Sequence, residues 1–174
     1  MSTVRHERPG VYSSYDASAV VSGGGGGGTV GLAAASGKGT AGTLYELSRY
    51  EDAVSQFGAE DGLTRLARVL FLNGAARVKA VPAAGESGYE AAFARLQEEE
   101  LSLMVCDSTD LAVQQKLRDS VESASAARRE RIAVVQGAAG ETVSQLVKRA
   151  EAVNSERVVL IAPGGAGGGL AAAA

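Results

Sequence analysis

Residues 101–137, LSLMVCDSTDLAVQQKLRDSVESASAARRERIAVVQG, decide the fold of this chain. They begin with a short apolar run that ends at Cys106, and a second apolar run follows at Ile132 to Val135. Between them, apolar residues recur once per helical turn. These residues are Val113, Leu117, Val121 and Ala124. Two apolar runs joined by an amphipathic helix predict a strand, a helix and a second strand parallel to the first.

The same alternation extends along the chain in both directions. The predicted strands are Thr29 to Ser36, Ala76 to Val81, Leu101 to Cys106, Ile132 to Val135 and Arg157 to Ala162. The predicted helices are Tyr50 to Phe57, Leu63 to Leu72, Tyr89 to Leu96, Leu111 to Ala127, and a last one whose apolar stripe is Val143, Leu146, Val147, Ala150 and Val153. The chain is therefore predicted to be α/β, with a mostly parallel sheet flanked by helices.

Two local signals refine these elements. Asn73 and Gly74 are a typical C-terminal stop for the second helix. The continuous Val-Val-Leu-Ile core of residues 158–161 predicts a strand that is covered on both faces.

Composition limits the classes of function. The chain has 174 residues, which suits one domain with an appendage. Its net charge of -3 gives no reason to expect direct contact with nucleic acid. A single cysteine excludes an intrachain disulfide and favours folding in a reducing compartment. The chain lacks a cationic leader and an apolar run long enough for a membrane span, so we expect no membrane insertion.

Glycine divides the chain into three parts. We expect residues 1–22 to be an extended N-terminal arm, residues 23–28 a flexible glycine linker, and residues 29–174 an α/β body domain. The arm is extended in character because Pro9 fixes its own φ and disfavours helix for Glu7. Two interpretations of the arm remain open on this ground: a strand that adds to another chain's sheet, and a tail without fixed structure.

Two glycine-rich stretches resemble nucleotide-binding loops. A phosphate-binding loop has four residues between its first glycine and the Gly-Lys pair, but five separate Gly31 from Gly37-Lys38, and Gly39 stands where a hydroxyl is needed. Gly167, Gly169 and Ala172 match a dinucleotide pattern that any glycine-rich tract satisfies by chance. We interpret both stretches as glycine-rich turns and expect no cofactor.

Catalytic and metal sites find little support. Cys106 and Ser108 end a predicted strand, but the only histidine, His6, lies in the arm, so we interpret Cys106 as a buried structural residue. Asp107, Ser108 and Thr109 are interpreted as N-terminal caps. Caps and a solvated helix end also account for the acidic residues Asp107, Asp110 and Glu98 to Glu100, so we assign no cation to them. The basic residues Arg128, Arg129 and Arg131 are interpreted as a solvated surface.

Four segments, in order along the chain, carry a resemblance to a known family. They are Arg8-Pro-Gly-Val-Tyr12, the small-residue strand at Gly28 to Ser36, Leu47 to Gly58 ending in Gln-Phe-Gly, and Asn154-Ser-Glu-Arg-Val-Val-Leu-Ile-Ala-Pro163. Together they resemble the tail sheath proteins of contractile phages and related bacteriocins. Family members continue into a second half, so the resemblance implies that the body domain is truncated at its C-terminal end.

The resemblance implies a structural subunit and no enzyme. Such a subunit polymerises around the tail tube and contracts to drive the tube through the target envelope. Its partners are other copies of itself, the tail tube protein, and the baseplate and tail terminator proteins, in a virion tail or bacteriocin particle assembled in the bacterial host cytoplasm. The implied intersubunit arm consists of Glu7, Arg8, Pro9, Gly10, Val11, Tyr12, Ser13, Ser14 and Tyr15.

Two other functions remain as alternatives. One is a small-ligand or nucleotide-binding α/β domain that uses the loops after Cys106, Val135 and Ala162. The other is a tail adaptor or baseplate component with the same fold, which differs from a sheath subunit mainly in copy number.

Overall fold

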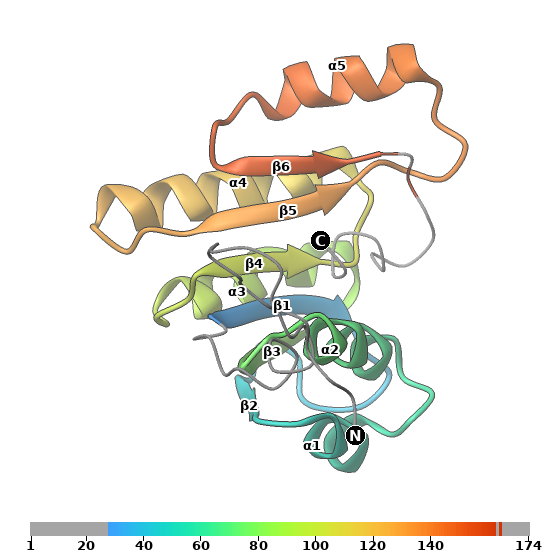
Figure 1. Ribbon diagram of the computed structural model, residues 1–174, viewed down its shortest axis with the longest axis vertical. Helices are drawn as coiled ribbons and strands as arrows, with labels where there is room; N and C mark the ends of the chain where they lie inside the picture. Colours follow the sequence, from blue (N-terminus) through green and yellow to red (C-terminus); the bar gives the residue numbers. More distant parts are fainter. Residues whose placement is uncertain (1–27, 163, 165–174) are drawn as a thin grey trace, which may run out of the picture.

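The computed structural model describes residues 28–162 and 164, which form one sheet with helices on both faces (Figure 1). The strands are β1 (Thr29–Ala35), β2 (Tyr45–Leu47), β3 (Arg77–Ala83), β4 (Leu103–Cys106), β5 (Ile132–Gln136) and β6 (Val158–Ile161). The helices are α1 (Tyr50–Phe57), α2 (Gly62–Leu72), α3 (Gly85–Gln97), α4 (Leu111–Ala126) and α5 (Val143–Val153). The strand order is β2-β3-β1-β4-β5-β6, and only β2 runs antiparallel to its neighbour. The predicted fold class is confirmed.

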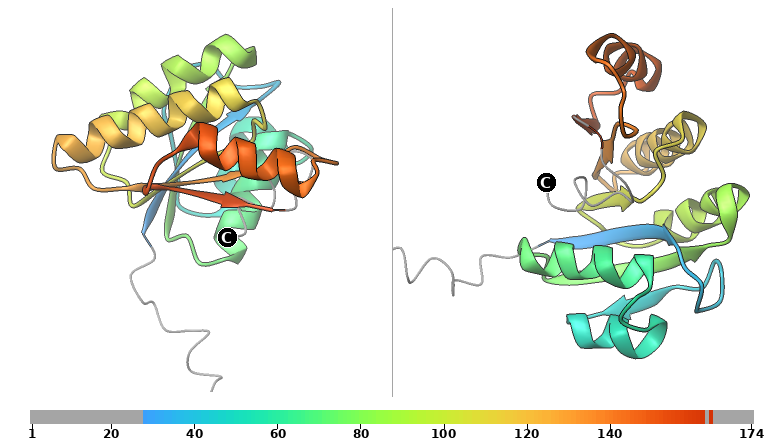
Figure 2. Two further views of the ribbon diagram at one scale, coloured as in Figure 1. Left: turned by 90° about the horizontal axis from the view of Figure 1, so that it is seen from above. Right: turned by 90° about the vertical axis from the view of Figure 1, so that its right-hand side faces the viewer.

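Helices cover the two faces of the sheet unequally. α1 and α2 lie on one face, and α3 and α4 lie on the other, with α5 packed beside α4 (Figure 2). β1 lies at the centre and supplies both cores, because Leu32 and Ala34 point to the α1/α2 side while Ala33 points to the α3/α4 side. The small side chains of β1 admit close neighbours: a Cβ atom at Gly31 would lie 2.6 Å from Leu101 Cδ1.

β2 is the strand that sequence reasoning missed. It has only three residues, which pair with Ala80, Lys79 and Val78 of β3. Tyr45 packs edge-on against Phe57, with ring centroids 4.9 Å apart, and its hydroxyl accepts a hydrogen bond from the Thr40 amide at 3.0 Å. Three residues are too few to show a strand periodicity, so β2 is visible only once β3 offers it a partner.

The caps of α2 and α4 are single aspartates. Asp110 caps α4 by accepting from the amides of Ala112 and Val113 at 2.7 and 3.2 Å, which confirms the interpretation of this acidic residue as a cap. The prediction that Asp107, Ser108 and Thr109 cap this helix is wrong. Those three residues belong instead to the turn after β4. The predicted end of α2 is confirmed, because Asn73 is its C-cap and Gly74 takes a left-handed φ of 96°.

The last strand and helix depart from prediction. In the described chain, β6 pairs with β5 alone and is an edge strand, and Val159 is 44 % exposed. The prediction that this strand is covered on both faces is therefore wrong. α5 buries Arg149 and Val153 but leaves Val143 and Val147 of its apolar stripe 77 % and 51 % exposed. α5 lies beyond β6 in the view of Figure 1 and packs against α4.

Candidate functional site

The order β3-β1-β4-β5-β6 places a topological switch point between β1 and β4. The connections from these two strands leave toward opposite faces of the sheet, and open α/β sheets bind ligands in the crevice that results. The crevice lies at the carboxyl ends of the strands, next to Ala35 and Cys106. This is the first place to look for chemistry.

The Asp107 carboxylate occupies this switch point. Its Oδ2 accepts a hydrogen bond from the Ala35 amide at 3.0 Å, and its Oδ1 accepts one from the Tyr89 hydroxyl. Burial and then the hydrogen bond to Asp107 raise the pKa of Tyr89 well above its ordinary value of 10.0. Tyr89 is therefore a neutral donor that anchors α3 to the end of β4, and it is unsuited to act as a base.

A second carboxylate fills the loop after β1. Asp61 Oδ2 accepts hydrogen bonds from the Gly37 amide at 2.9 Å and from the Ser36 hydroxyl at 3.0 Å, while Oδ1 caps α2 at the Leu63 amide. Backbone amides of this loop are the groups that would bind a phosphate in a nucleotide-binding protein. Because carboxylates already accept from them, an incoming phosphate would meet negative charge. The stretch from Gly31 to Lys38 is therefore the end of β1 followed by a turn whose donors Asp61 already occupies.

The environment of Cys106 fits the structural role predicted for it. Its side chain is 1 % exposed, and burial raises the pKa of the thiol to about 12. A protonated, buried thiol is a poor nucleophile. His6, the base that a nucleophile would need, lies outside the described residues.

The acidic and basic clusters are engaged in the fold. The Glu99 carboxylate pairs with Lys79 and with Arg95, each at 2.6 Å. These hydrogen bonds, above all the one from Lys79, hold the pKa of Glu99 below its ordinary range. Within residues 28–162, no three His, Cys, Asp or Glu side chains gather where they would hold a metal ion. Arg131 is 3 % exposed and donates to the carbonyls of Leu96 and Glu99, so the prediction that it belongs to a solvated basic surface is wrong.

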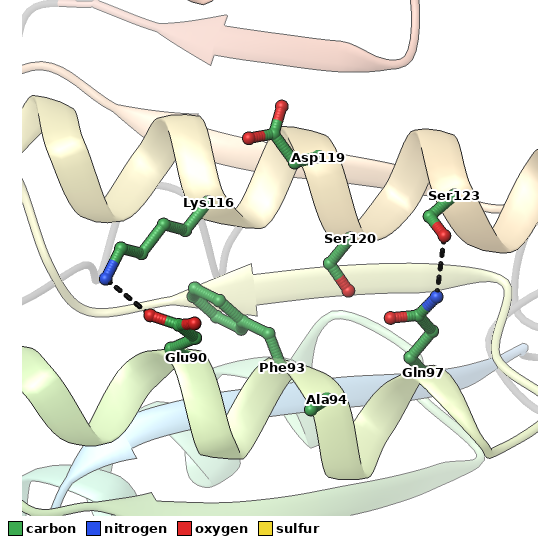
Figure 3. Close-up of a pocket in the computed structure, with 8 residues that line it drawn as sticks. All are labelled: Glu90, Phe93, Ala94, Gln97, Lys116, Asp119, Ser120 and Ser123. Atoms are coloured by element: carbon green, nitrogen blue, oxygen red, sulfur yellow. Dashed lines mark hydrogen bonds and ion pairs between the residues drawn. The ribbon is translucent and has the colours of Figure 1, made fainter.

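A groove lies between α3 and α4 (Figure 3). Its volume is about 320 Å³, and it is lined by Glu90, Phe93, Ala94, Gln97, Lys116, Asp119, Ser120 and Ser123. An ion pair between Lys116 and Glu90 at 2.8 Å and a hydrogen bond from Gln97 to Ser123 at 2.9 Å bridge the two helices. The buried Ser120 hydroxyl has no partner within the described chain. This groove lies away from the strand ends and is lined by no acid and base pair suited to catalysis.

Among residues 28–162, β6 pairs on one side only, with β5. The carbonyls of Arg157 and Ile161 accept from the Ala133 and Gly137 amides of the β5 segment. Because successive residues of a strand point their polar groups to alternate sides, Val158 and Leu160 direct theirs away from β5. Val143 and Val147 of α5 are exposed. An unpaired strand edge can accept a further strand.

The predicted arm, Glu7 to Tyr15, lies outside the described residues, so its role stays a prediction. Sequence reasoning missed the roles of Asp61 and Asp107, and the burial of Arg149. Asp61 had a usable signal, because an aspartate directly before an apolar helical pattern is a typical N-cap. Asp107 and Arg149 had none, since their partners lie far away in the sequence.

No family model and no curated protein matches this chain. Solved structures do match, among them the helical sheath of the anti-feeding prophage in its contracted state, with a TM-score of 0.55 and 17 % sequence identity over 90 % of this chain. The chain shares the fold of this sheath protein. The six-fold symmetrised baseplate of the same prophage matches with a TM-score of 0.54, at 17 % identity over 90 % of the chain.

The resemblance to contractile sheath proteins is thus confirmed at the level of the fold. This chain spans 45 % of the matched sheath chain and 46 % of the matched baseplate chain, which is less than half of each. None of the helices in the described part combines the length and apolar character needed to cross a bilayer.

Proposed function

We propose that this chain is a structural subunit of a contractile sheath, which polymerises around a tail tube and contracts to drive the tube through a target envelope. The observation that carries the proposal is the match of 90 % of the chain to the fold of a helical sheath. The closed switch point supports it, because the carboxylates of Asp61 and Asp107 occupy the donors that a nucleotide would need. A switch point whose donors are already occupied favours an assembly role over an enzymatic one.

The partners follow from this role. We propose contacts with other copies of the chain, with the tail tube protein, and with baseplate and tail terminator proteins. The subunit would lie in the tail of a virion or of a bacteriocin particle, after assembly in the host cytoplasm. Residues 7–15 would add a strand to a neighbouring subunit, residues 23–28 would serve as the tether, and the domain that begins at residue 29 would form the body.

A baseplate component is the second candidate, because a baseplate structure matches nearly as well as the sheath. The two roles differ in copy number and position. Immunogold electron microscopy with antibodies against this chain separates them: label along the whole tail supports a sheath subunit, whereas label at one end supports the baseplate role. Label absent from every tail-like particle contradicts both and directs attention to ligands of the α3/α4 groove.

Deletion of residues 1–22 tests the arm. We expect the truncated protein to keep the thermal unfolding transition of its body, because the deletion removes none of the residues of the two described core clusters, and to lose assembly. Sheaths that form with normal length and yield from the truncated subunit would show that the arm is dispensable.

A further inference from the structure

The α3/α4 groove contains a buried hydroxyl whose hydrogen bond is unmade. Ser120 is 9 % exposed, and its Oγ has no hydrogen-bond partner in the part of the chain that the structure describes. Figure 3 shows this hydroxyl pointing toward α3, between the two helices. Buried polar groups in native proteins are almost always paired, and each exception needs a physical reason. A polar group that enters the groove from outside would supply the missing partner.

The size and frame of the groove fit one long side chain. Its volume of about 320 Å³ is at the lower end of the range for ligand pockets. The ion pair between Lys116 and Glu90 stands at one end, and the hydrogen bond from Gln97 to Ser123 stands at the other (Figure 3). Between these ends, Phe93 of α3 supplies apolar surface. The groove therefore fits a side chain with an apolar stem and a polar end.

The unused polar atoms of the groove are mostly acceptors. Two carboxylates, those of Glu90 and Asp119, line it against one ammonium group, that of Lys116. Asp119 accepts from Arg118 through Oδ1 alone. Gln97 uses its amide nitrogen in the bridge between the helices and keeps its Oε1 as an acceptor. An arginine matches such a lining, because its guanidinium carries five donors on an apolar stem and its positive charge balances the excess carboxylate.

The chain itself presents two arginines that lack acceptors. Arg128 and Arg129 lie in the turn between α4 and β5, and within residues 28–162 neither guanidinium makes an ion pair or a hydrogen bond. Glu130, the acid next to them in the sequence, pairs with Arg157 instead. Arg128 has a φ of 63°, the left-handed conformation for which a helix end favours glycine. An arginine at such a position, without a polar contact inside the described fold, suits a role outside the subunit.

We propose that the α3/α4 groove of one subunit binds the Arg128–Arg129 turn of a second copy. A guanidinium seated in the groove would donate to Ser120 and Asp119, while its stem would lie along Phe93. Groove and turn are different surfaces of one chain, so the contact is heterologous, and a pair of subunits keeps one free groove and one free turn. Such contacts repeat along a row of subunits. This inference rests on the proposed sheath role for its setting and adds a contact between the bodies of two copies.

Two variants, each defective on one side of the contact, test the proposal by sedimentation velocity on the full chain. Ala94→Phe fills the groove from an exposed position, and Arg128→Gln combined with Arg129→Gln removes the charge of the turn. We expect wild type to self-associate as its concentration rises, and each variant alone to lose about tenfold or more in association constant. An equimolar mixture of the two variants should recover association and stop at a 1:1 complex, because only one intact turn and one intact groove remain. Arg77→Gln, which removes another exposed arginine, is the matched control and should associate as wild type does.

A small probe tests the chemistry of the groove separately. In the labelled full chain, the NMR signal of the Ser120 amide should shift saturably with N-acetylarginine amide and much less with N-acetylcitrulline amide, which has the same shape without the charge. Equal responses to the two probes, or no response to either, overturn the assignment of an arginine. Circular dichroism of every variant reports whether the fold is intact.

The association experiment has three results that overturn the contact between copies. They are a wild-type chain that stays monomeric up to about 1 mM, variants that associate as strongly as wild type, and a mixture that shows no recovery, which a symmetric contact of groove with groove would give. The sheath role fails by a different result. A chain that makes this contact but labels no tail-like particle keeps the groove and loses the sheath role, whereas a labelled tail built from a chain without this contact does the reverse.

Discussion

The two halves of the sheet are built differently. β3, β1 and β4 lie between α1 and α2 on one face and α3 and α4 on the other, and β1 is buried almost throughout. In the described part of the chain, Val158 and Leu160 of β6 pack on the α3/α4 side, and the outer helix, α5, is joined to α4 through a buried arginine while much of its apolar stripe stays exposed. The first half completes its own core. Among the described residues, the second half leaves more large apolar side chains exposed, among them Val143, Val147 and Val159.

The largest expected contrast concerns burial. Phe57→Ala, in the first half, should lower the free energy of unfolding by about 3–5 kcal/mol, because Phe57 is 1 % exposed and its loss leaves a cavity against Tyr45. Val147→Ala, in the second half, should change it by less than about 0.5 kcal/mol in the unassembled chain. Urea unfolding monitored by circular dichroism measures both. Equal costs would contradict the contrast between the halves.

Polar contacts should matter more in the second half. Arg149 donates to Glu141 at 2.6 Å, to the Thr109 carbonyl at 2.9 Å and to Gln114 at 3.1 Å, and these bonds tie α5 to the start of α4. Arg149→Met should destabilise the protein by about 2–3 kcal/mol, because Glu141, Gln114 and the Thr109 carbonyl lose their hydrogen-bond donor. The part-exposed Glu141 regains some hydration, which limits the loss. The neighbouring exposed Lys148→Met is the matched control. A near-neutral Arg149→Met would mean that apolar contacts hold α5.

Asp107→Ala tests the closed switch point. It leaves the Tyr89 hydroxyl and the Ala35 amide without their acceptor, and we expect a cost of about 1–2 kcal/mol. Asp119→Ala, on the exposed face of α4, should cost less than about 0.5 kcal/mol. Chemical denaturation measures both variants. A stabilised Asp107→Ala protein that also gained affinity for phosphate would indicate a ligand site that the carboxylate keeps closed.

The smallest effect is a dependence on pH. The hydrogen bond from Arg149 holds the pKa of Glu141 below its ordinary value of 4.5. A lowered pKa in the folded state means that Glu141 stabilises the protein above that ordinary value and that this contribution is lost as the pH falls through the folded-state pKa. Wild type should therefore exceed Glu141→Gln in thermal stability at neutral pH, and the two should converge in acid. A gap that persists in acid would assign the stability difference to packing.

Much of the fold was predictable from local pattern. Apolar runs of four or more residues and helical stripes set the order and type of ten of the eleven described elements, because burial on one or two faces requires a matching periodicity in the chain itself. The buried state of Cys106 was also predictable, since it ends an apolar run with no base nearby in the sequence. β2 was not, because three residues show no period.

Only the tertiary structure decided which residues far apart in the sequence contact each other. The pattern at residues 158–161 is that of a buried strand, yet β6 lies at the edge, because strand order depends on how the crossovers stack and not on the strand's composition. Arg131 and Arg149 look like surface residues in the sequence, but carbonyls and side chains from distant segments meet their guanidinium groups and allow burial. Asp107 closes the switch point only because β1 and Tyr89 are brought to it. The sequence by itself determined which segments are strands and helices, since that depends on neighbours along the chain; which edges stay open and which charges are buried depended on neighbours in space.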